Sequence, residues 1–86
     1  MKRRGFTSIS IDRYVELHMR SNPGDSRKRL KAALESALRA SMGGVTCRCG
    51  NPIWVIGSAL AGNACFTCIT GESFPDEDYE IDEALS

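Results

Sequence analysis

The sequence predicts a small α+β domain, in which an N-terminal helical hairpin packs on a β-hairpin that carries four cysteines, and an acidic tail follows. Apolar residues recur at helical spacing in the first half, and a short β-branched stretch lies between two close pairs of cysteines. The length of 86 residues indicates one domain and excludes the large enzyme scaffolds. We expect helices over residues 1–44 and the cysteine hairpin over 45–71 to fold as one unit, with the tail over 72–86 outside it.

The first expected helix begins after Ser10, whose side chain is suited to an N-cap. Its apolar face follows the helical period, and the turn at Asn22-Pro23-Gly24 ends it. The residues of that face are Ile11, Tyr14, Val15, His18 and Met19. We interpret His18, the only histidine, as a half-buried packing residue.

The second expected helix is capped by Asp25 or Ser26, and Gly43-Gly44 ends it. The short turn between the two helices favours an antiparallel pair. The predicted buried stripe of the second helix consists of Leu30, Ala33, Leu34, Ala37, Leu38 and Ser41.

The pattern changes after Gly44. Residues 52–58 are rich in β-branched and aromatic side chains, with Trp54 in the middle, and predict a strand. Residues 61–63 have turn chemistry, and residues 64–67 predict a second strand that closes the hairpin. We expect Trp54 to pack in the core against a helix. The acidic tail is expected to be mobile, or to dock on the basic second helix, with Tyr79 and Ile81 as apolar anchors for a protein partner.

The four cysteines are the main chemical feature, and they stand at Cys47, Cys49, Cys65 and Cys68. No targeting segment or membrane-spanning run is evident, so we expect a cytoplasmic protein whose thiols stay reduced. Two turns that each present two thiolates suit tetrahedral zinc, and Gly50 permits a tight turn after the first pair. A domain this small commonly needs such a staple. We therefore predict one structural Zn²⁺ held by all four cysteines, with disulfides or an iron–sulfur centre as the alternatives.

Residues 45–71 resemble a zinc ribbon through these four cysteines, Gly50 and the expected hairpin. The first pair is Cys-x-Cys, where the ribbon pattern has Cys-x-x-Cys. The order of the two pairs is also similar to the zinc centre of redox-regulated heat-shock chaperones, which implies an oxidisable site.

Charge divides the chain in two although the formal net charge is zero. Residues 1–42 carry ten basic and four acidic side chains, whereas residues 43–86 carry Arg48 and seven acidic side chains. Opposite charges of this kind can pair within one molecule, between two molecules or with separate partners. The function that we expect is a non-enzymatic zinc-binding module that acts through a protein partner, because no catalytic constellation is present. Two alternatives remain open: nucleic-acid binding through Arg27, Lys28, Arg29 and Lys31 together with Lys2, Arg3 and Arg4, or with Trp54 as a stacking platform, and a thiol-based redox sensor.

Overall fold

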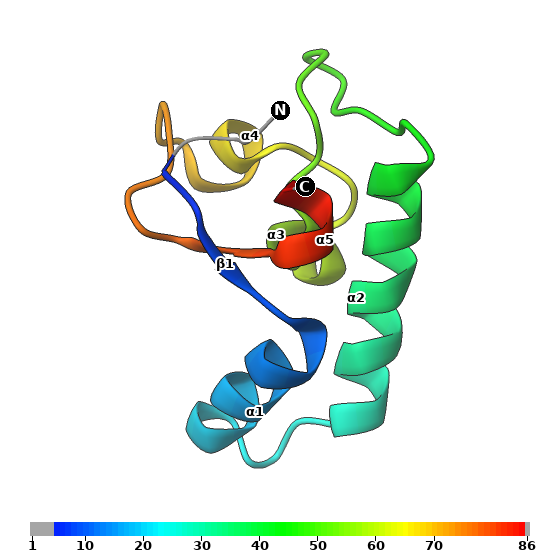
Figure 1. The fold of residues 1–86 in the computed structure, drawn as a ribbon, viewed down its shortest axis with the longest axis vertical. Coiled ribbons are helices and arrows are strands. Elements are labelled where there is room, and N and C mark those ends of the chain that lie inside the picture. The colour runs from blue at the N-terminus through cyan, green and yellow to red at the C-terminus, as the bar shows by residue number, and fades with distance from the viewer. Residues whose placement is uncertain (1–4, 86) are drawn as a thin grey trace.

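The computed structural model describes residues 5–85, and it contains five helices and two short strands within that range. Lys2, Arg3 and Arg4, which belong to the alternative of nucleic-acid binding, lie outside the described residues. In chain order (Figure 1), the elements are β1 (Thr7–Ile9), α1 (Ile11–Ser21), α2 (Arg27–Met42), α3 (Val55–Ala61), α4 (Phe66–Thr70), β2 (Tyr79–Ile81) and α5 (Asp82–Leu85).

The predicted helical hairpin is confirmed. The Oγ of Ser10 accepts a hydrogen bond from the Arg13 N–H at 3.1 Å, and the Oγ of Ser26 accepts one from Arg29 at 3.2 Å. Each side chain therefore satisfies a backbone donor that the first turn of its helix leaves open. At the far end of α2, Gly43 is the C-cap and Gly44 has φ +90°, a conformation that favours glycine.

The core lies between α2 and the elements packed on its inner face. In Figure 1, α2 runs along one side of the molecule, with α1 near its start and α3 and α5 beside its middle. Helix α3 makes its most extensive contacts with α2, as predicted for the segment around Trp54. The buried residues of this core are Ile9, Val15, Leu30, Leu34, Ala37, Leu38, Val55, Ile56 and Ile81. Four residues of the stripe predicted for α2 are buried in this core: Leu30, Leu34, Ala37 and Leu38.

The predicted β-hairpin is wrong, because neither expected segment forms a strand and a helix begins inside each of them. Residues 55–61 form α3, and residues 66–70 form α4. A β-branched sequence has only a weak intrinsic preference for strands, and tertiary contacts override it. Here a side chain from another part of the chain caps α3: the buried carboxylate of Glu80 accepts hydrogen bonds from the Val55 N–H at 2.9 Å and the Ile56 N–H at 3.3 Å.

The expectation that the acidic tail lies outside the core is also wrong. Strand β2 pairs in parallel with β1, in a register that places Ile9 beside Ile81. Glu80 and Ile81 are both fully buried, and the Trp54 indole N–H donates to the Tyr79 carbonyl oxygen at 2.8 Å. The acidic composition of residues 72–86 is misleading because Glu80 and Ile81 lie on β2, which packs into the core.

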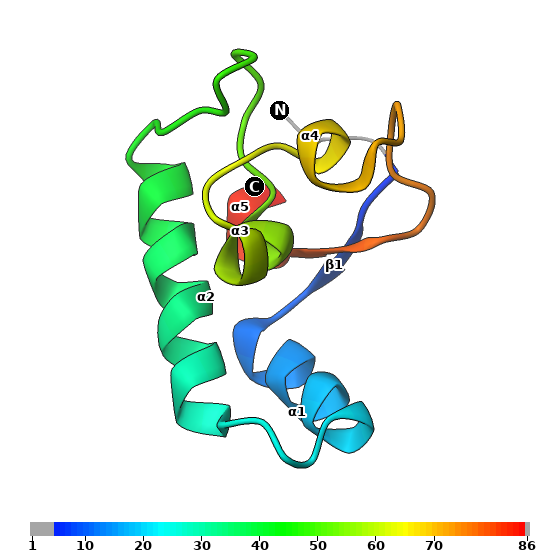
Figure 2. The same cartoon turned by 180° about the vertical axis from the view of Figure 1, so that it is seen from behind.

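The acidic loop does not dock on the basic start of α2. Residues 71–78 lie beside α4 at one end of the molecule, whereas α2 begins at the other end, and both views show this separation (Figures 1 and 2). Viewed from behind, the loop that leaves α2 at residue 43 passes above the helix and descends to α3 close to α4 (Figure 2). The fold thereby brings residues 43–54 next to α4, where the second cysteine pair lies.

Candidate metal centre

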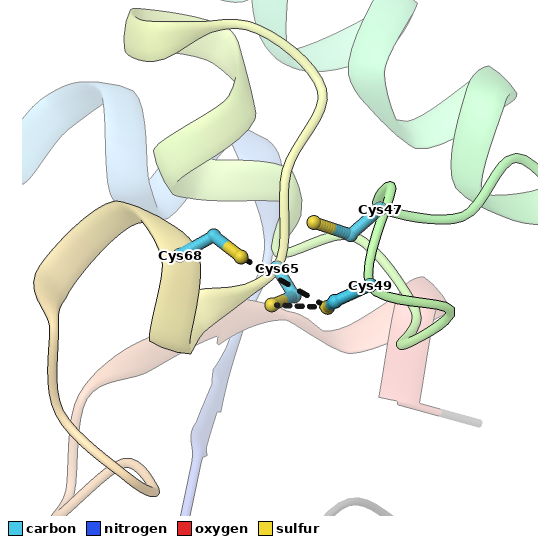
Figure 3. Close-up of side chains that lie close together, drawn as sticks. All are labelled: Cys47, Cys49, Cys65 and Cys68. Carbon is cyan, nitrogen blue, oxygen red and sulfur yellow. Dashed lines mark hydrogen bonds between the residues drawn. The ribbon is translucent and has the colours of Figure 1, made fainter.

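The first cysteine pair lies in a tight turn between residues 46 and 52. The Cys47 N–H donates to the Asn51 carbonyl oxygen at 2.8 Å, and the Gly50 N–H donates to the Cys47 carbonyl oxygen at 2.8 Å. An antiparallel bridge between Thr46 and Pro52 closes the turn. Gly50 has φ +92°, so the conformation predicted for this glycine is confirmed. These bonds hold the side chains of Cys47 and Cys49 on one side of the turn (Figure 3).

The second pair lies at the start of α4. Cys65 is the N-cap of this helix and Cys68 is in its first turn. Residues three apart lie on the same face of a helical turn, so this spacing points both thiols in one direction. The strand expected over residues 64–67 contains Cys65 but leaves Cys68 just beyond its end. The start of α4 thus presents the second cysteine pair, where the sequence analysis expected the end of a hairpin.

The four sulfur atoms gather at one point (Figure 3), where all Sγ atoms lie within 4.8 Å of one another. The Sγ of Cys49 is 3.4 Å from that of Cys65 and 3.9 Å from that of Cys68. Four sulfurs at about 2.3 Å from a tetrahedral zinc ion are about 3.8 Å apart, so the observed spacing is close to that of a four-thiolate site. The same distances exceed the S–S bond of about 2.05 Å, and all four cysteines are free thiols.

Hydrogen bonds within the cluster shift the pKa values of Cys47, Cys65 and Cys68 in different directions. The backbone N–H groups of Cys49 and Cys65 lower the pKa of Cys47 to about 6. Burial acts to raise the pKa of Cys65, but the backbone N–H of Cys68 and the thiol of Cys49 leave it lowered. Hydrogen bonds from its own thiol to Cys47, Cys65 and Cys49 raise the pKa of Cys68 to about 12. Sulfurs this close hold a shared set of protons that a metal dication displaces.

One cysteine of each pair is buried and one is exposed. Cys47 and Cys65 lie on the protein side of the cluster, whereas Cys49 and Cys68 face solvent. The side-chain amide of Asn51 is 3.4 Å from the Sγ of Cys49 and donates to it. Amide donors of this kind orient a sulfur ligand from the second coordination sphere. The donor set therefore fits a soft or borderline metal ion with four sulfur ligands.

Two other predicted residues lie apart from the cysteines. The His18 Nε2 lies 2.7 Å from an Asp25 carboxylate oxygen, so this histidine ties α1 to the turn before α2 and takes no part in the cluster. Trp54 is half-buried against the core, as expected. The sequence analysis missed Glu80, and the available signal was a glutamate inside the apolar run Tyr79-Glu80-Ile81.

Comparisons with protein-family models, with curated proteins and with solved structures give no match. The likeness to a zinc ribbon therefore rests on the four clustered cysteines alone, without the ribbon's hairpin. None of the helices in the described part of the chain has both the length and the apolarity needed to cross a bilayer.

Proposed function

We propose that this protein is a non-enzymatic interaction module in which Cys47, Cys49, Cys65 and Cys68 hold one structural Zn²⁺. The observation that supports the proposal most directly is the meeting of four Sγ atoms within 4.8 Å of one another. Four thiolates complete the tetrahedral shell of zinc and leave no position for a water nucleophile, which favours a structural role. The metal would join the turn at residues 46–52 to α4.

A metal at this position stabilises the fold because residues close in sequence to its cysteine ligands are buried. Phe66 directly follows Cys65, is buried, and lies with its ring 5.0 Å from that of Trp54. On the other side, Ile53 is buried four residues after Cys49. Metal binding in small four-ligand modules contributes on the order of 10 kcal/mol to folding.

The proposal is tested by elemental analysis of protein purified without added metal, followed by chelation. We expect about one zinc ion per chain. After chelation, we expect a lower helical signal in circular dichroism and a red shift of Trp54 fluorescence, because α4 and Phe66 lose their anchor. Cys65→Ser should have the same effect, whereas Ser73→Ala, outside the cluster, should keep its zinc. Fewer than about a tenth of a zinc ion per chain, with four free thiols and an unchanged fold, would refute the proposal.

The exposure of Cys49 and Cys68 favours one further function, that of a thiol redox sensor. An oxidant reaches these sulfurs from solvent, and their separation of 3.9 Å is short enough for a disulfide to form after a small movement. Two thiolates would give two electrons to one hydrogen peroxide, which takes two protons and becomes two water molecules. Equimolar peroxide should then release zinc within minutes, and a zinc reporter dye measures that release. Retention of zinc under these conditions would leave only the structural role.

A further inference from the structure

A small apolar hollow opens beside the cysteine cluster. Its volume is about 180 Å³, and its lining includes Phe6, Pro52, Cys65, Phe66, Phe74 and Pro75. The Phe74 side chain is 74% exposed, more than any other large apolar side chain in the described chain. Small-molecule sites usually enclose about 300–1,000 Å³. The hollow is therefore suited to a single apolar side chain of a partner, with Phe74 at its rim.

Aromatic packing makes the floor of this hollow rigid. The ring of Phe66 lies edge-on to Phe6 at 5.7 Å and to Trp54 at 5.0 Å, while Phe6 and Trp54 are stacked at 6.3 Å. Phe66 is held in place by α4 and by its neighbour Cys65. A preformed apolar floor lowers the ordering cost of binding.

The surroundings of the hollow are acidic. Glu72, Asp76 and Glu77 are exposed in the same loop as Phe74, and within residues 5–85 none of these three forms an ion pair. A zinc ion with four thiolates adds a net charge of −2 beside them. Arg48 is the only basic residue after residue 42. A partner segment with positive charge would complement these carboxylates.

We propose that the hollow binds an extended segment of a partner protein in which one apolar side chain is flanked by lysine and arginine. The apolar side chain enters between Phe66 and Phe74, while the cationic side chains pair with Glu72, Asp76 and Glu77. One apolar anchor inside a charged rim is a common arrangement in protein interfaces. This inference rests on the proposed function, because the metal holds α4 and thereby Phe66 in place.

The test uses the full, zinc-loaded chain, labelled with ¹⁵N, and a defined nine-residue peptide with one central Leu between four Lys and four Arg residues. We expect the amide resonances of Thr67, Ser73 and Phe74 to shift on titration, and the affinity to fall with added salt. Replacement of the central Leu by Ser in the peptide should weaken binding at least tenfold. Phe74→Ala should also weaken binding, because the central Leu of the peptide then loses the apolar contact that Phe74 makes at the rim of the hollow. The exposure of Phe74 leaves the fold of that variant intact.

Matched controls separate a specific site from general attraction. Leu60 is 65% exposed on α3, away from the hollow, so Leu60→Ala should leave the affinity unchanged. The double variant Asp76→Asn, Glu77→Gln should weaken binding and flatten its salt dependence. Glu35→Gln, which removes a negative charge at an exposed position of α2, should do neither.

Four results would overturn the inference. Equal binding of the Leu and Ser peptides would show that only charge acts, and shifts confined to α1 and α2 would place the contact elsewhere. A dimer that forms in light scattering and is lost in Phe74→Ala would identify a second copy of this chain as the occupant. Zinc content is measured on the same sample, so a zinc-loaded chain that ignores the peptide refutes the docking site alone, whereas a folded chain without zinc refutes the proposed function.

Discussion

Glu80 provides the most demanding test of how this fold is held together. Its carboxylate is fully buried and accepts hydrogen bonds from the backbone N–H groups of Val55 and Ile56, at the start of α3. The Ile81 N–H donates to the same carboxylate at 2.9 Å. The N-cap residue of α3, Trp54, offers no side-chain acceptor of its own. Glu80 therefore does for α3 what Ser10 and Ser26 do for α1 and α2, but from a distant strand.

Removal of this carboxylate should destabilise the protein strongly. In Glu80→Ala, the two α3 donors stay buried without an acceptor, and at about 1–3 kcal/mol for each donor the loss is about 2–6 kcal/mol. For a chain of 86 residues, the whole free energy of unfolding is about 4–13 kcal/mol. Glu80→Gln keeps one acceptor oxygen but turns an amide N–H₂ toward a backbone donor, so we expect a loss of about 1–3 kcal/mol.

The assay is urea unfolding at a fixed zinc concentration, followed by far-ultraviolet circular dichroism, because free metal shifts the apparent stability. Glu72→Gln is the matched control: this side chain is exposed, and its loss of charge should change the free energy of unfolding by less than about 0.5 kcal/mol. If both Glu80 variants unfold within about 0.5 kcal/mol of the parent chain, the carboxylate does not cap α3 and the reasoning is refuted.

Three further predictions concern other parts of the molecule. Ile81→Ala should lower the free energy of unfolding by about 2–5 kcal/mol in the same assay, because Ile81 is fully buried; a loss below about 1 kcal/mol would show that the tail is outside the core after all. Gly57→Ala should destabilise the protein, although alanine favours helices by about 1 kcal/mol, because the new Cβ would collide with the Trp54 ring and lie 2.8 Å from the Ile69 Cδ1; a rise in melting temperature would contradict this packing. Zinc affinity should fall as the pH falls, and more steeply below about 6, the pKa of Cys47, because protons then compete for that ligand as well as for Cys68; a chelator competition series from pH 5 to 8 that gives a constant affinity would refute four-thiolate binding.

The candidate site could be predicted from sequence because its spacing is compatible with more than one local structure. Close pairs of cysteines bring thiols together in a turn or at the start of a helix alike. The structure brings these four predicted residues together, whereas the strand expected around Cys65 is replaced by the start of a helix. The proposed docking surface had no comparable signal, since Phe6 is far in the chain from Phe66 and Phe74 and joins them only in the folded protein.

The sequence by itself determined the helical hairpin and the prediction that the four cysteines form one cluster. Apolar spacing, the serine caps and the Gly43-Gly44 exit act over a few residues, so they identify α1 and α2 without knowledge of the rest of the fold. Tertiary structure alone decided the conformation of residues 52–70 and the role of the tail. The β-branched stretch becomes α3 because Glu80, 24 or more residues away, supplies the acceptor that its first turn needs. Parallel pairing of β1 with β2 then buries Ile81, and no local pattern records a contact between residues 72 positions apart.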